Sequence, residues 1–232
     1  MFKVANAALQ ILRFLGVSIF RGTPCIQHEC QDFLDILNIQ VQIKGHLPAG
    51  PCLLVANHRS FLDVLALGQM DQMVFVTSQE VASSRFTGLF SRLAGCILVE
   101  RRNYSTLLQD IEVIKQHMLA GQKVCVFPEA TTTNGVEMAR WRSSLFEAAV
   151  KTNTPVVPIA IDYTSVNGQT VTEKNRDILY YIDDMTFYDH IKNIFKIKDA
   201  HINIKILKPI SGLNRKILAC VAERAVKDAL HT

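Results

Sequence analysis

The sequence alternates short apolar runs with segments of helical periodicity, and this pattern constrains the fold more than any other feature. Seven β-rich runs lie at Val41–Ile43, Cys52–Ala56, Met73–Val76, Cys96–Val99, Lys123–Phe127, Val156–Ile161 and His201–Leu207. Helical patterns fall between them, most clearly at Tyr104–Ala120, Trp141–Lys151 and Leu213–Leu230. Strands that are apolar along their whole length are typical of a parallel sheet covered on both faces. We therefore expect an α/β fold with a mostly parallel central sheet flanked by helices.

Two smaller expectations complete this outline. Gly121 is placed to end the helix at Tyr104–Ala120, because glycine is the usual residue just beyond a helix C-terminus. Residues 164–195 lack clean periodicity and are expected to form an insertion or a lid-like excursion.

Length and charge set broad limits on function. A chain of 232 residues fits one large α/β domain, or a domain with a small appendage. The mean hydropathy of +0.16 is high, but no run reaches the roughly 18 apolar residues of a membrane span. The net charge of +4 fits an anionic membrane surface or an anionic substrate. The sequence has no basic block of the kind that would favour nucleic acid as a partner.

The six cysteines indicate reduced thiols. No CxxC pair occurs, and Cys52, Cys96 and Cys125 lie within apolar runs, as buried thiols do. The group Cys25, His28 and Cys30 matches no zinc spacing, so we expect no metal there. A reducing, cytosol-facing location follows.

The N-terminal segment is expected to be helical and amphipathic. Met1–Arg21 is mostly apolar, with a narrow polar stripe formed by Lys3, Asn6, Gln10 and Arg13. Such a helix suits the interface of a membrane, although packing on the domain core is the alternative. With a second helical segment at Cys25–Leu37, we expect residues 1–37 to form a membrane-interfacial helical segment and residues 38–232 to form the main domain.

A histidine and an aspartate follow the apolar run Cys52–Ala56. His58 and Asp63 have four residues between them, and a histidine oriented by an aspartate is a general base for a hydroxyl proton. On an unbroken helix the two side chains would point about 140° apart. They can meet only if His58 lies in a strand-to-helix turn and Asp63 on the following helix. A capping box from Ser60 to Asp63, serving only the helix N-terminus, is the alternative.

Other ionisable residues follow the predicted strands at the same edge. Arg101 and Arg102 follow Cys96–Val99, Glu129 follows Lys123–Phe127, and Asp162 follows Val156–Ile161. Ligands bind outside the carboxyl ends of the strands in such sheets. Arg101 is suited to hold a phosphate bidentately, and Glu129 is suited to position a substrate hydroxyl. We therefore expect a general base, a cation and a carboxylate to converge at this edge.

Four ordered segments resemble the PlsC-type glycerolipid acyltransferase family, the 1-acylglycerol-3-phosphate acyltransferases. The family patterns are Asn-His-x4-Asp, Gly-x-Ile-x-Val/Ile-x-Arg, Phe-Pro-Glu-Gly-Thr-Arg and Val-Val-Pro-Ile/Val. They correspond here to Asn57–Asp63, Gly95–Arg101, Phe127–Thr132 and Val156–Ile159, and the resemblance covers roughly residues 40–165. Four motifs in order are a far stronger signal than any one of them.

Two residues depart from the family pattern. Ala130 replaces the glycine after the glutamate, which we take as a small change, and Thr132 replaces an arginine expected to grip the acceptor phosphate. Arg142, in a segment similar to another basic stretch of the family, is positioned to supply charge instead. The threonines resemble the branch that includes lyso-ornithine lipid acyltransferases, so that acceptor is an alternative.

The resemblance implies a lysophospholipid O-acyltransferase that acts without a covalent intermediate. His58 and Asp63 would be catalytic, Arg101 would hold the acceptor phosphate, and Glu129 would lie near the glycerol. Asn57, Thr131 and Arg142 complete the expected substrate-binding residues. The acyl donor would be acyl-CoA or acyl-carrier protein, with no cofactor and no metal.

The same resemblance implies where the enzyme works and leaves other classes of function open. Its acceptor would be 1-acylglycerol-3-phosphate or a related lysolipid at the cytoplasmic face of the cell membrane. A thioester hydrolase and a catalytically idle membrane-binding domain are the alternatives of other classes.

Overall fold

The described part of the chain is one mixed sheet with helices on both faces. The computed structural model describes residues 26–79, 96–100, 106–182 and 185–231. The strands are β1 (Ile39–Lys44), β2 (Leu53–Ala56), β3 (Met73–Ser78), β4 (Ile97–Val99), β5 (Lys123–Val126), β6 (Val156–Val166), β7 (Gln169–Thr170) and β8 (Ala200–Ile206). The helices are α2 (Ile26–Leu37), α3 (Leu62–Gly68), α6 (Leu107–Leu119), α7 (Phe146–Thr152), α8 (Phe187–Ile194), α9 (Arg215–Leu230) and a short 3₁₀ helix, η1 (Arg176–Ile178).

The sheet is parallel at its centre and reversed at one edge. Its strand order is β1-β8-β6-β2-β5-β3-β4, with β7 paired to β6. The five strands from β6 to β4 run parallel, whereas β8 pairs antiparallel with β6 and carries β1 parallel to itself. The expected mostly parallel sheet flanked by helices is confirmed, and each of the seven predicted apolar runs forms a strand.

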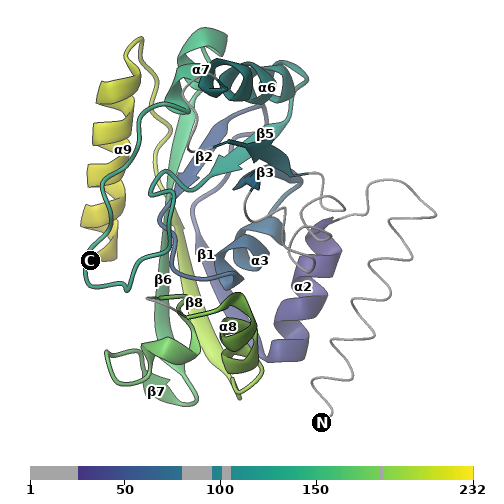
Figure 1. The fold of residues 1–232 in the computed structure, drawn as a ribbon, viewed down its shortest axis with the longest axis vertical. Helices are drawn as coiled ribbons and strands as arrows, with labels where there is room; N and C mark the ends of the chain where they lie inside the picture. Colours follow the sequence, from purple (N-terminus) through teal and green to yellow (C-terminus); the bar gives the residue numbers. More distant parts are fainter. Residues whose placement is uncertain (1–25, 80–95, 101–105, 183–184, 232) are drawn as a thin grey trace, which may run out of the picture.

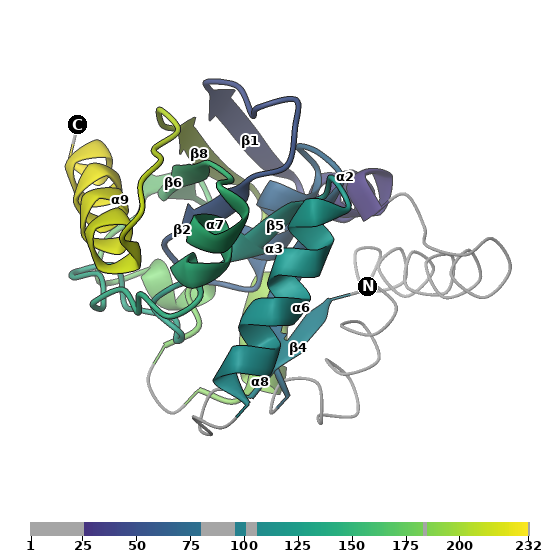
Figure 2. The same ribbon diagram turned by 90° about the horizontal axis from the view of Figure 1, so that it is seen from above.

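The two faces of the sheet bury separate apolar cores. Helices α6, α7 and α9 cover one face, and α2, α3 and α8 cover the other (Figure 1). Figure 2 shows α6 beside β4 on the first of these faces. In β2, Leu53 and Val55 enter the first core and Leu54 and Ala56 the second, all fully buried. This two-sided burial explains why the strand is apolar at every position.

Helix α6 ends as the sequence predicts. Gly121 has φ +84°, and its N–H donates to the carbonyl of Met118 at 3.0 Å, while Gln122 N–H donates to the carbonyl of His117 at 3.1 Å. These are the two hydrogen bonds of a Schellman motif, which requires the left-handed conformation that glycine adopts easily.

Helix α7 begins later than its periodicity predicts, at Phe146 instead of Trp141. The N–H of Trp141 donates to Oε2 of Glu223 on α9 at 3.0 Å, and the N–H of Arg142 donates to the carbonyl of Pro128 at 3.0 Å. These two hydrogen bonds attach residues 141–142 to α9 and to the segment after β5, outside the helix.

The expectation that Asp162 follows its strand is wrong. Strand β6 continues to Val166, and Asp162 lies within it, opposite Asn203 of β8. The antiparallel partner extends β6 beyond the point where its parallel neighbour β2 has ended. A carboxylate on this half of β6 is tolerated because its side chain is 41% exposed.

The helical N-terminal prediction is only partly within the described residues. Residues 1–25 lie outside them, so the proposed interfacial helix stays a prediction. Helix α2 packs against α3 and contributes the buried side chains Leu34 and Leu37 to the core. Among the described residues, no helix has the length and apolar character needed to cross a membrane.

Candidate active site

The turn between β2 and α3 brings His58 and Asp63 together. Because β2 ends at Ala56 and α3 begins at Leu62, the histidine lies in the turn and the aspartate in the first turn of the helix. The Nδ1 atom of His58 is 2.9 Å from Oδ2 of Asp63. This is the arrangement that the motif spacing requires.

The other edge of the imidazole is open. His58 stacks on the ring of Phe127, with centroids 4.0 Å apart and planes inclined by 16°, and its side chain is 21% exposed. Its Nε2 atom makes no hydrogen bond with the described part of the chain. The geometry therefore leaves Nε2 available to take a proton from a bound hydroxyl.

Asp63 makes the contacts of both roles that the sequence presents as alternatives. Its Oδ2 atom, besides bonding His58, accepts hydrogen bonds from the N–H groups of Arg59 at 2.7 Å and Ser60 at 2.9 Å. Its Oδ1 atom accepts the hydroxyl of Tyr163 at 2.6 Å. The carboxylate is fully buried and satisfied by four donors, so it fixes the turn and the imidazole at the same time.

Asn57 holds the motif on the neighbouring strand. Its Nδ2 donates to the carbonyl of Ile161 at 2.9 Å, and the N–H of Ile161 donates to its Oδ1 at 2.8 Å. The side chain is 1% exposed. The sequence interpretation of Asn57 as substrate-binding has no support in this geometry, because the amide is already used by the backbone of β6.

Glu129 braces the histidine turn from the end of β5. Its Oε1 accepts the N–H of His58 and its Oε2 accepts the N–H of Ala139, both at 2.8 Å. Burial raises the pKa of the Glu129 carboxyl, and the two N–H donors oppose that rise. The side chain lies beside the base as expected, but its two oxygens are bonded to the protein backbone.

The threonines after Glu129 point to different partners. Thr131 is exposed, and its hydroxyl donates to the neighbouring carbonyl of Thr132 at 3.3 Å. The hydroxyl of Thr132 donates to the carbonyl of Tyr181 at 2.5 Å, and the N–H of Thr133 donates to the carbonyl of His58 at 3.0 Å. Thr132, which stands where the family pattern has an arginine, therefore bonds the segment before α8.

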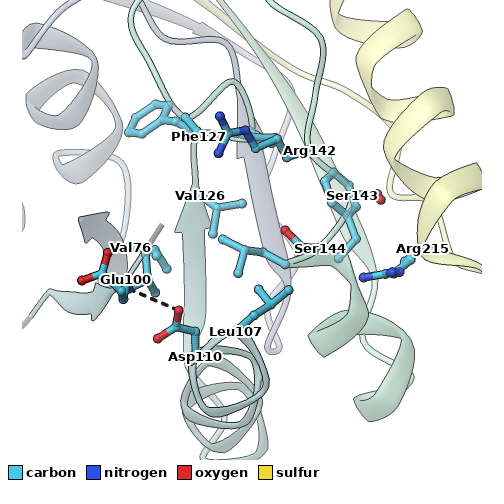
Figure 3. Close-up of a pocket in the computed structure, with 15 residues that line it drawn as sticks. Val76, Glu100, Leu107, Asp110, Val126, Phe127, Arg142, Ser143, Ser144 and Arg215 are labelled. Carbon is cyan, nitrogen blue, oxygen red and sulfur yellow. Dashed lines mark hydrogen bonds between the residues drawn. The ribbon is translucent and has the colours of Figure 1, made fainter. Parts of the chain in front are cut away.

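A pocket of about 460 Å³ lies on the face covered by α6, α7 and α9. Phe127 belongs to its wall and also stacks on His58, so this ring connects the pocket to an imidazole that does not itself line it. Its apolar lining includes Val76, Val99, Leu107, Val126, Leu145 and Phe146, and its polar lining includes Glu100, Asp110, Arg142, Ser143, Ser144 and Arg215 (Figure 3).

The charges of this pocket are separated in space. Figure 3 shows Arg142 beside Phe127, and Asp110 with Glu100 away from them. Asp110 accepts the N–H of Glu100 at 3.2 Å, and burial raises the pKa of its carboxyl. Arg142 is exposed and has no ion pair within the described residues. An acidic group of a ligand would find an available cation at the Phe127 end.

The sequence prediction missed Arg215, which lines the pocket from the start of α9 and lies 3.7 Å from Glu147 of α7. Nothing in its neighbourhood along the chain signals this role. Arg101 and Arg102 lie outside the described residues, so the predicted phosphate contact of Arg101 stays a prediction.

His190 was also missed, and it supports the turn from α8. Its Nε2 accepts the N–H of Phe61 at 3.3 Å and lies 3.3 Å from Oγ of Ser60. The ring is fully buried, and burial lowers the pKa of His190 to about 4. A neutral imidazole, whose Nε2 accepts a hydrogen bond, therefore supports the turn just before α3.

Within the described residues, no three potential metal-ligating side chains form a metal-binding group.

Comparison with known proteins assigns the family. The family model described as "Acyltransferase" matches residues 38–162, which is more than half of the chain and includes His58, Asp63, Glu129 and Arg142. The chain belongs to the acyltransferase family. This confirms the resemblance seen in the four ordered motifs.

Individual relatives of this acyltransferase act on different lipids, by their names. The present chain is 29% identical to the lyso-ornithine lipid O-acyltransferase of Pseudomonas aeruginosa, over 84% of this chain and 73% of the relative. It is 27% identical to the 1-acyl-sn-glycerol-3-phosphate acyltransferase of Neisseria gonorrhoeae, over 59% and 54% of the two chains.

A solved structure confirms the fold of this acyltransferase. The crystal structure of PlsC from Thermotoga maritima, a 1-acyl-sn-glycerophosphate acyltransferase, superposes with a TM-score of 0.61 at 19% identity. The match covers 99% of this chain and 98% of the other. The described part of the acyltransferase therefore has the same α/β architecture.

Proposed function

We propose that this acyltransferase moves a fatty acyl group from an acyl thioester to the free hydroxyl of a lysolipid. The observation that carries the proposal is the pairing of His58 Nδ1 with buried Asp63 at 2.9 Å, with Nε2 left open. Acyl-CoA and acyl-carrier protein are the donor classes with the required thioester.

The chemistry follows from this geometry. His58 Nε2 takes the hydroxyl proton of the acceptor as its oxygen attacks the thioester carbonyl, and the imidazolium is stabilised by Asp63. When the tetrahedral intermediate collapses, the C–S bond breaks and the proton passes to the departing thiolate. General-base assistance of this kind contributes roughly 10²–10⁴-fold to the rate.

The acceptor is a lysolipid whose headgroup carries a phosphate or a carboxylate. Arg142 at the pocket, together with Arg101, would attract either a phosphate or the carboxylate of an ornithine headgroup. The first candidate is 1-acylglycerol-3-phosphate. Lyso-ornithine lipid is the second candidate, favoured by Thr132 in place of a cation and by the name of the Pseudomonas relative.

One assay tests this proposal directly. Purified protein receives a labelled acyl-CoA or acyl-carrier protein and either lysophosphatidic acid or lyso-ornithine lipid in detergent micelles. We expect labelled diacyl product with one of the lipids and its loss in His58→Ala. Equal release of free thiol with and without acceptor would instead identify a thioester hydrolase, and no turnover of any kind would favour an idle membrane-binding domain.

We also propose that the enzyme works at the cytoplasmic face of the membrane, where its lipid acceptor resides. The amphipathic pattern of residues 1–21 supports this. Deleting these residues should release the protein from vesicles of anionic phospholipid in a sedimentation assay. Unchanged co-sedimentation would show that other surfaces bind the membrane.

A further inference from the structure

The carboxylate of Asp63 is held by a residue of strand β6 as well as by its own turn. Tyr163 on β6 donates its hydroxyl to Oδ1 at 2.6 Å, whereas the histidine and two backbone N–H groups bond Oδ2. The two oxygens of Asp63 therefore have separate hydrogen-bond partners. Because Tyr163 fixes Oδ1 toward the sheet, Oδ2 is directed at His58.

Strand β6 holds the motif at both ends. The backbone of Ile161 clamps the amide of Asn57, the first residue of the motif, and Tyr163 bonds Asp63, the last residue. Ile161 bonds Asn57 through its backbone, which is possible because β6 pairs with β2. Tyr163 bonds Asp63 through its side chain, which is buried in the core shared with α3.

The phenol is suited to donate continuously. Tyr163 is 3% exposed, and its ring packs edge-on against Tyr180 with centroids 5.3 Å apart. Burial and the charge of Asp63 raise the pKa of the Tyr163 hydroxyl well above its ordinary value. The hydroxyl therefore keeps its proton throughout the working range of a histidine base.

We propose that Tyr163 is a positioning residue of the reaction. By donating to Oδ1, its hydroxyl orients Asp63 toward His58 and draws part of the carboxylate charge away from the imidazole. This inference rests on the proposed function of His58. Removing the phenol hydroxyl would leave Oδ1 without its donor and shift the carboxylate charge toward the imidazole, which would then hold its proton to higher pH.

The test compares Tyr163→Phe with Tyr180→Phe in the full-length protein. Tyr180 is also buried, and its hydroxyl lies 3.3 Å from Nη1 of Arg59, so the control loses the same group without touching Asp63. We expect Tyr163→Phe to lower kcat about tenfold, as for a lost hydrogen bond to a charged group, with KM for the acceptor unchanged. The acid limb of its kcat–pH profile should move to higher pH, while that of Tyr180→Phe should not.

A second variant guards against a simple packing defect. Site-specific 3-fluorotyrosine at position 163 keeps the ring and hydroxyl but makes the phenol a stronger donor, so the acid limb should move to lower pH. A loss of packing cannot produce opposite shifts in the two variants. Superimposable profiles for wild type and both variants, with His58→Ala inactive, would overturn the inference. If wild type transfers no acyl group or His58→Ala stays active, the proposed function itself is wrong.

Discussion

At the scale of single residues, two buried carboxylates organise the site. Asp63 and Glu129 each accept backbone N–H groups of the histidine turn or the loop beside it. Glu129, expected to position substrate, and Asp63, expected to orient His58, therefore also hold the protein backbone. Substitutions here should affect both turnover and stability, and the ratio of the two effects distinguishes the roles.

Asp63→Asn tests this at the carboxylate. The neutral amide cannot stabilise the imidazolium, so we expect kcat to fall by about 10²–10⁴-fold while KM changes little. The backbone N–H groups would also lose their charged acceptor, lowering the free energy of unfolding by roughly 1–3 kcal/mol. Steady-state kinetics and urea unfolding measure the two effects, with exposed Glu137→Gln as control. Lost stability with unchanged kcat would reduce Asp63 to a helix cap.

Ala130 shows that a substitution taken as small from the sequence is a strained one. It has φ +59°, in the left-handed region that glycine adopts freely and that costs an alanine about 1–2 kcal/mol. The family's glycine at this position therefore has a conformational reason. The expectation of a small change was wrong for the backbone, although the side chain itself is only a methyl group.

Ala130→Gly should stabilise the protein by about 1 kcal/mol, because it removes this strain. Ala139→Gly is the matched control, since Ala139 lies in the same loop without a positive φ and should lose a few tenths of a kcal/mol. The midpoint of urea unfolding measures both. A lower midpoint for Ala130→Gly would show that the turn is not strained in solution.

At the scale of elements, an insertion without clear periodicity supports the turn that holds His58. Residues 164–195 contain the end of β6, β7, η1 and α8, and α8 carries His190 to Ser60 and Phe61, directly before α3. Its imidazole must stay neutral to accept the N–H of Phe61. The pKa of His190 is about 4 in the folded protein, below the ordinary value of 6.5, so the unfolded chain binds the extra proton.

The stability contributed by neutral His190 is therefore present above about pH 6.5 and is lost as the pH falls toward 4. The difference of 2.5 in pKa corresponds to about 3 kcal/mol. Urea unfolding at neutral pH and near pH 4 should show this loss in wild type. His190→Gln should have a flatter pH dependence, whereas His46→Gln, at an exposed position, should keep the wild-type slope. Equal slopes in all three would contradict the assignment.

At the scale of the whole molecule, the pocket is assembled from segments far apart in sequence. Its lining comes from β3, β4 and β5, from α6 and α7, from the segment between β5 and α7, and from α9. Arg142 lies at the Phe127 end of the pocket (Figure 3), and the Phe127 ring stacks on His58. The acceptor headgroup would be recognised where these elements meet.

Arg142→Gln should raise KM for an acidic lysolipid about tenfold with kcat retained, since a charge-assisted hydrogen bond is removed from binding. Arg140→Gln is the matched control, because Arg140 is exposed in the same segment and does not line the pocket. Acceptor titrations at fixed acyl donor measure both variants. Equal KM values for the two would show that the headgroup binds elsewhere.

The sequence by itself determined the strands, the family and the pairing of His58 with Asp63. Apolar runs such as Leu53–Ala56 form strands because two-sided burial demands it, and the pairing of His58 with Asp63 follows from the geometry of one short turn. Local geometry is encoded in local spacing, so these features could be predicted.

Only the tertiary structure decided which distant groups meet that turn. Tyr163 lies 100 positions from Asp63, and His190 lies 129 positions from Phe61. Asn57 is clamped by a strand 104 positions away, and Arg215 reaches the pocket from the last helix. These contacts depend on β6 lying beside β2 and on α8 and α9 covering opposite faces. No local periodicity specifies strand order, because it results from how the whole chain buries its apolar surface.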